Sequence, residues 1–212
     1  MRNATIAAKK TGKGQNVKDF SEAALPEPDE RIARMLYSQK PGEIPLLEVC
    51  TALNHIEAAK LQKGKAGQEA CNDVLMGVKR AVALAIEDGL SAKPAANERA
   101  LAFFREVSAQ SRVKGREQNL LIGIAVREAV AALARATDEA LLIGGKSGSE
   151  IQEDRDQVIK AAKIVFALGN PTSARLIRAV SGVFKEENVF KWGTESLDGM
   201  AARLERNAEK KK

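Results

Sequence analysis

Apolar residues recur at three- and four-residue spacing through most of this 212-residue chain, and no segment alternates apolar and polar residues as a β-strand does. The stripe Cys71, Val74, Leu75, Val78, Val82 and Ala85 is typical. This spacing puts apolar side chains on one face of a helix, whereas a half-buried strand requires a period of two. We therefore predict an all-α fold, a single compact helical domain of six to eight helices.

Glycine and proline divide the chain into the expected helices. They begin near residues 29, 44, 68, 94, 116, 149, 172 and 194, and the last one runs into the C-terminal tail. Residues 116–142 are apolar around most of the helix circumference, which predicts a central, buried helix. We expect Gly89 to follow a helix end, and Ser149 with Gln152 to form a capping box.

Positive charge gathers at the two ends of the chain. The net charge is +6; residues 1–18 carry five basic residues and no acid, and residues 201–212 carry +3, which leaves −2 for residues 19–200. We predict a basic flexible arm over 1–28, a helical domain over 29–200 and a basic tail over 201–212. Arms of this kind often neutralise the phosphates of nucleic acid, although they can also serve solubility alone.

Catalytic patterns are missing from the sequence. His55 is the single histidine, and Cys50 lies about 140° from it around the same predicted helix, so the two cannot easily meet. No metal-ligand spacing occurs. The segment Gly144-Gly145-Lys146-Ser147 departs from the phosphate-loop pattern twice, because Ala140 stands at the position of the first glycine and a helix precedes it instead of a strand. The alternative is an interhelical turn in which glycine adopts left-handed backbone angles. We expect no enzyme activity, no catalytic residue, no metal and no cofactor.

Residues 162–184 have the outline of a helix-turn-helix, in which the second helix presents its N-terminal side chains to DNA. The stretch Gly169-Asn170-Pro171-Thr172-Ser173-Ala174-Arg175 with Ala179-Val180 resembles the DNA-binding helix-turn-helix of the O6-alkylguanine-DNA alkyltransferases. That family's Pro-Cys-His-Arg motif is absent, so alkyl transfer is not implied. The alternative is an ordinary helical hairpin.

Further basic residues extend the candidate nucleic-acid contacts. Aromatics interleaved with lysines over residues 184–192 can stack on unpaired bases while the lysines follow the backbone, although such aromatics also anchor terminal segments to a core. The predicted contact residues are Lys9, Lys10, Lys13, Arg112, Lys114, Arg116, Thr172, Ser173, Arg175, Arg178, Lys185 and Lys191.

These observations favour a non-enzymatic nucleic-acid-binding protein, a small helical subunit of a larger nucleoprotein complex that contacts phosphates through Lys and Arg. The alternative is a helical structural or assembly protein that binds other proteins or self-associates. An enzyme with helix-borne carboxylates, drawn from Glu128, Asp138 and residues 150–156, ranks last. No apolar run approaches the roughly 20 residues that span a bilayer, so we expect no membrane partner and a cytoplasmic location.

Overall fold

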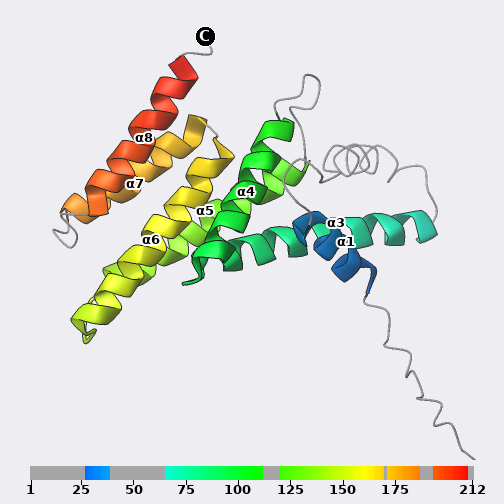
Figure 1. Ribbon diagram of the computed structural model, residues 1–212, viewed down its shortest axis with the longest axis horizontal. Coiled ribbons are helices and arrows are strands. Elements are labelled where there is room, and N and C mark those ends of the chain that lie inside the picture. Colours follow the sequence, from blue (N-terminus) through cyan, green and yellow to red (C-terminus); the bar gives the residue numbers. More distant parts are fainter. Residues whose placement is uncertain (1–26, 39–64, 112–119, 170, 187–192, 210–212) are drawn as a thin grey trace, which may run out of the picture.

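The computed structural model describes residues 27–38, 65–111, 120–169, 171–186 and 193–209, and within these ranges it contains helices and no strand. The helices are α1 (Pro28–Ser38), α3 (Lys65–Leu90), α4 (Pro94–Ser111), α5 (Leu120–Leu141), α6 (Gly148–Leu168), α7 (Pro171–Glu186) and α8 (Gly193–Glu209) (Figure 1). The all-α prediction is confirmed. The helix predicted near residues 44–61 and most of the predicted arm lie outside the described residues.

Helix α6 lies at the centre of the described fold. It contacts α3, α4, α5, α7 and α8, and it buries Val158, Ala161, Ala162, Ile164, Val165 and Leu168. The prediction that residues 116–142 form the central helix is wrong, because α5 exposes Gly123, Ala134 and Arg135 to solvent. Much of the apolar character of α5 comes from alanine and glycine, which are small enough to lie on a surface at little cost.

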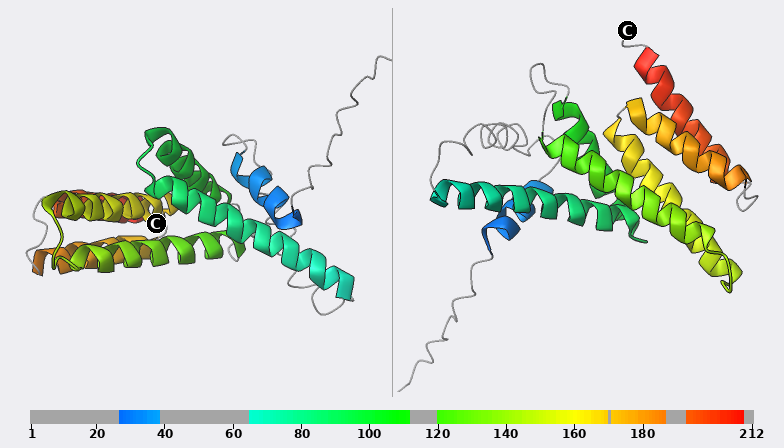
Figure 2. Two further views of the ribbon diagram at one scale, coloured as in Figure 1. Left: turned by 90° about the horizontal axis from the view of Figure 1, so that it is seen from below. Right: turned by 180° about the vertical axis from the view of Figure 1, so that it is seen from behind.

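The helices form two antiparallel pairs along one direction, with a third group packed across them. Figure 2 shows the pair α5–α6 beside the pair α7–α8, while α3 runs across the end of this arrangement with α1 on its outer side. The largest side chains of the core come from all of these groups, and each is fully buried: Leu36, Phe104, Leu121, Leu133, Ile164, Ile177 and Leu197. Each such side chain contributes about 1.5–3 kcal/mol of hydrophobic stabilisation.

Helix α6 is closed at both ends by its local sequence. Ser147 is the N-cap: its hydroxyl accepts from the backbone N–H of Glu150, and the Glu150 carboxylate accepts in turn from the backbone N–H of Ser147. The capping box therefore begins two residues before the predicted one at Ser149. Gly169 ends the helix in the left-handed region at φ 62°, where glycine is favoured.

We predicted that Gly89 follows the end of a helix, and this is wrong. Gly89 lies inside α3, which continues to Leu90. A Cβ at this position would lie 2.6 Å from Ile164 Cδ1, so the glycine allows α3 and α6 to approach closely.

At the other end of the chain, α8 continues to Glu209 and buries Ala201 and Leu204, so residues 201–209 of the predicted tail are helical. No described helix has both the length and the apolar character that a bilayer span requires.

Candidate nucleic-acid interface

The segment predicted as a helix-turn-helix forms a helical hairpin. Helices α6 and α7 run in nearly opposite directions in both ribbon figures, and α7 packs mainly against α8. The two helices of a helix-turn-helix cross much more steeply, at about 90–120°. Pro171 is the first residue of α7, so Thr172 and Ser173, which the sequence offers as caps, belong to the helix instead.

The outward face of α7 carries three basic side chains. Arg175, Arg178 and Lys185 are exposed and fall within about 80° of arc at 100° per residue, over roughly 15 Å of helix. We call these three residues the basic ridge. Thr172 is exposed at the N-terminal end of the same helix. The structure thus brings four of the predicted contact residues onto one exposed helix face.

The opposite face of α7 is buried. It consists of Ser173, Ala174, Ile177, Val180, Ser181 and Phe184. Ser173 is only 4% exposed, so its side chain cannot reach a ligand on the outward face, and it drops out of the predicted contacts. Apolar spacing predicts that Ile177, Val180 and Val183 hold this helix to the body; Ile177 and Val180 are buried, whereas Val183 is 37% exposed. Helix α7 packs mainly against α8.

Arg178 is held by a carboxylate of α8. Its Nε and Nη2 donate to the two Glu205 carboxylate oxygens at 2.8 and 2.6 Å, a bidentate pair. The hydrogen bonds from Arg178 lower the pKa of Glu205, and those to Glu205 raise the pKa of Arg178. At neutral pH both groups are charged and satisfy each other.

Lys185 is held in the same way further along the antiparallel pair of α7 and α8, which we call the α7–α8 hairpin. Its Nζ lies 2.5 Å from Asp198 Oδ2, and this hydrogen bond lowers the pKa of Asp198. Arg175 has no ion-pair partner among the described residues. Two of the three ridge cations are therefore neutralised by α8, which sequence analysis missed. A signal existed: Arg178 and Lys185 are seven residues apart, and so are Asp198 and Glu205.

The remaining predicted contact residues lie outside the described residues: Lys9, Lys10, Lys13, Arg112, Lys114, Arg116 and Lys191. The described ranges hold 19 of the 34 basic residues and 21 of the 28 acidic ones, a net charge of −2 against +6 for the whole chain. The other segments therefore carry +8. Positive charge is concentrated there and on α7.

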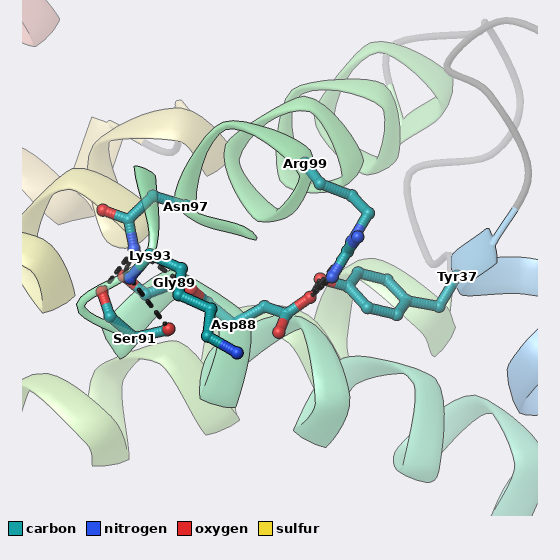
Figure 3. Close-up of polar contacts among 7 residues, drawn as sticks. All are labelled: Tyr37, Asp88, Gly89, Ser91, Lys93, Asn97 and Arg99. Atoms are coloured by element: carbon teal, nitrogen blue, oxygen red, sulfur yellow. Dashed lines mark hydrogen bonds and ion pairs between the residues drawn. The ribbon is translucent and has the colours of Figure 1, made fainter. Parts of the chain in front are cut away.

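A second polar cluster joins α1, α3 and α4 (Figure 3). The Tyr37 hydroxyl donates to Asp88 Oδ2 at 2.6 Å, and Arg99 donates to the same oxygen. Burial and the bond to Asp88 raise the pKa of Tyr37. Burial also raises the pKa of Asp88, but the hydrogen bonds from Tyr37 and Arg99 outweigh it and leave that pKa below its usual value. The Asp88 carboxylate of α3 thus binds one side chain of α1 and one of α4, so the cluster is a structural junction between the three helices.

The Asn97 amide completes this junction. Its nitrogen lies within 3.0 Å of three carbonyl oxygens at the end of α3, those of Asp88, Gly89 and Ser91. The last carbonyls of a helix lack intrahelical donors, so the amide caps the C-terminal end of α3 from the first turns of α4. The Asp88 carbonyl also accepts from the backbone N–H of Ser91. No local sequence pattern marked Tyr37 or Asn97, because their partners lie on other helices or in another turn.

The glycine-containing turn between α5 and α6 uses its lysine for packing. Lys146 Nζ donates to the Glu139 carbonyl at 2.8 Å and to Asp154 Oδ2 at 2.7 Å, so it ties the end of α5 to the start of α6. This matches the interpretation of the turn as an interhelical connection. Within the described ranges, no three His, Cys, Asp or Glu side chains are grouped so as to hold a metal ion.

Comparison with known proteins returns no match: no family model, no curated protein and no solved structure is similar to this chain.

Proposed function

We propose that this protein binds nucleic acid without catalysing a reaction, through Lys and Arg contacts to the phosphate backbone, as a small helical subunit of a larger nucleoprotein complex. The observation that carries the proposal is the basic ridge of α7. Three cations share one exposed face, and the single acid of α7, Glu186, comes at its last residue. Such a face attracts polyanions without reading base sequence.

The charge of the other helices supports this choice of surface. Among the described helices α7 alone has a net positive charge, three basic residues against one acid, whereas α3, α5, α6 and α8 are net negative and α1 and α4 are neutral. Helix α7 therefore offers the largest excess of cations among the described helices, although α8 pairs two of them with its own carboxylates. The segments outside the described ranges, with +8, supply further cations.

Fluorescence anisotropy with labelled double-stranded DNA, single-stranded DNA and single-stranded RNA, each over a series of salt concentrations, tests the proposal. We expect binding whose logarithm falls linearly with the logarithm of the salt concentration. Arg175→Ala should weaken it and reduce the slope by about 0.9 on duplex DNA, one phosphate contact. Arg105→Ala is the matched control, because Arg105 is an exposed arginine of α4 with no ion-pair partner among the described residues.

Two results would count against this function. If the protein binds none of the three probes at low salt, the proposed function is excluded. An equal loss of affinity in Arg105→Ala and Arg175→Ala would show that total charge matters and that α7 is not the contact surface.

A second candidate function, protein assembly, is favoured by one feature. Leu142 is 68% exposed and Ile143 36% exposed at the turn between α5 and α6, a position where polar residues are usual. A partner protein or a second copy could cover these side chains. Light scattering over a concentration series tests self-association, and Leu142→Ser with Ile143→Ser should abolish it if this turn is the contact.

A further inference from the structure

Two cations of the basic ridge pair with two acids of α8, and the spacing is the same on both helices. We call these two ion pairs the ladder. Arg178 pairs with Glu205 and Lys185 pairs with Asp198, and the members of each set are seven residues apart on antiparallel helices. Seven residues are two helical turns, so both cations and both acids lie on one face of the hairpin. The ladder therefore runs along the surface where the proposed function places the nucleic acid.

The geometry of the ladder imitates phosphate binding. The Glu205 carboxylate takes two parallel hydrogen bonds from Arg178, the same fork that a guanidinium presents to two phosphate oxygens. Asp198 gives Lys185 a single close oxygen, as a phosphate would. A nucleic acid can gain these two cations only by replacing the two carboxylates.

Replacement does not require the hairpin to open. The side chains of Arg178 and Lys185 are 47% and 54% exposed, and those of Glu205 and Asp198 are 41% and 34% exposed. Exposed ion pairs contribute little net stability, so their rupture leaves the hairpin folded. The two helices pack closely on each other, and both contribute buried side chains to the core, among which are Ile177, Phe184, Leu197 and Leu204.

We propose that Asp198 and Glu205 act as intramolecular substitutes for phosphate, which hold Lys185 and Arg178 and lower the affinity of α7 for nucleic acid. The inference rests on the proposed function. Weakly charged anions cannot displace the carboxylates, whereas a polyanion held at the same time by Arg175 and by the basic segments presents phosphates at high local concentration. The two acids thus set how much negative charge a ligand needs before it binds all three cations of the basic ridge.

The test compares two double variants of α8 that change the net charge equally. Asp198→Asn with Glu205→Gln removes the two acids of the ladder and is called the released variant. Glu195→Gln with Glu209→Gln is the control, because these exposed acids belong to the same helix and form no ion pair with a described residue. Binding of full-length protein to labelled duplex DNA is measured by anisotropy from 50 to 200 mM salt. Circular dichroism confirms that all proteins are folded.

The released variant should bind more tightly than wild type and gain about two phosphate contacts. Each contact adds about 0.9 to the salt slope, so the ratio of affinities at 50 and 200 mM salt should grow about tenfold relative to wild type. The control should keep the wild-type ratio within about twofold. Arg178→Gln with Lys185→Gln, added to the released variant, should return the slope to the wild-type value. If the double variant folds poorly, Glu205→Gln alone should show about half the change in slope.

Three results decide between the readings. Equal salt slopes in the released and control variants would overturn the inference. If wild type still binds in a salt-dependent way in that case, the proposed function stands. An unchanged slope after removal of Arg178 and Lys185 from the released variant would also overturn the inference. Absence of binding by wild type and by the released variant at 50 mM salt would overturn both.

Discussion

Gly77 of α3 lies where α1 crosses this helix, and we expect Gly77→Ala to force the two helices apart. A Cβ at Gly77 would lie 2.6 Å from Ile32 Cβ, 2.7 Å from Ile32 Cγ2 and 2.9 Å from the Asp29 carbonyl oxygen. A backbone oxygen and a Cβ atom cannot rotate away as a flexible side-chain end can. Relief of the overlap therefore requires α1 as a whole to move.

Two opposing effects set the magnitude. Alanine in place of glycine in a helix interior stabilises by about 1 kcal/mol. Overpacking of a close contact costs about 1–3 kcal/mol. Gly123 of α5 provides the matched control, because it is also inside a helix and a Cβ there meets no atom within 4 Å. Gly123→Ala should show only the gain, so the two variants should differ by about 1–3 kcal/mol in unfolding free energy.

Equilibrium urea unfolding followed by far-ultraviolet circular dichroism measures the difference, and each kcal/mol corresponds to about 2–4 °C in Tm for a chain of this size. The near-ultraviolet signal of Tyr37 reports on α1 independently, since Tyr37 packs edge-on against Phe103 with ring centroids 5.5 Å apart. Equal stabilisation by both alanines, with the Tyr37 signal unchanged, would refute the close seating of α1 on α3.

Three further changes test other parts of the structure. The pKa of Asp88 is depressed in the folded protein, so its ionised carboxylate stabilises the fold above the ordinary carboxyl pKa, and this stability is lost as the pH falls below about 4. Urea unfolding at pH 7 and pH 3 should therefore show a smaller loss of stability at low pH for Asp88→Asn than for wild type. An identical loss in both proteins would contradict this. Ser147→Ala should reduce stability by about 0.5–2 kcal/mol through loss of the α6 cap, whereas Ser149→Ala should change it little, and the reverse order in urea midpoints would restore the cap predicted from sequence. Phe104→Ala should cost about 3–5 kcal/mol in the same assay, because the ring is fully buried, and a loss under 1 kcal/mol would place it outside the core.

Helix content and several helix ends could be predicted from the sequence because they depend on local physics. Pro94 begins α4, Leu168 ends α6 before the left-handed Gly169, and α1 begins within one residue of the predicted start. Apolar spacing reports which side of a helix will be buried, and proline and glycine report where it cannot continue. These signals act over a few residues and need no knowledge of the partner helix.

The central helix could not be predicted, because centrality depends on which helices pack together. Composition favoured residues 116–142, yet α6 is the helix with neighbours on several sides. Gly89 shows the same limit. A glycine near a predicted helix end has two explanations, a left-handed cap or a close approach, and only the position of Ile164 on a distant helix decides between them.

The candidate site shows the same difference between local sequence signals and the packing of distant helices. Arg175 is exposed on α7, as a contact residue must be, whereas Ser173 is buried on another side of the same helix and cannot serve as one. The pairing of Arg178 and Lys185 with α8 is tertiary information. Its trace in the sequence, two cations and two acids each seven residues apart, becomes meaningful only if the two helices are known to be antiparallel neighbours.

In the α7–α8 hairpin, stability and charge are separated, which the proposed exchange of carboxylates for phosphates requires. Buried apolar side chains such as Phe184 and Leu197 hold the helices together, while the ion pairs lie at the solvent-exposed edge and contribute little to folding. A ligand that replaces Glu205 and Asp198 therefore meets an electrostatic competitor, not the cost of unfolding. That competition depends on salt and on ligand charge, so ionic strength alone should shift the balance between the closed ladder and the bound state.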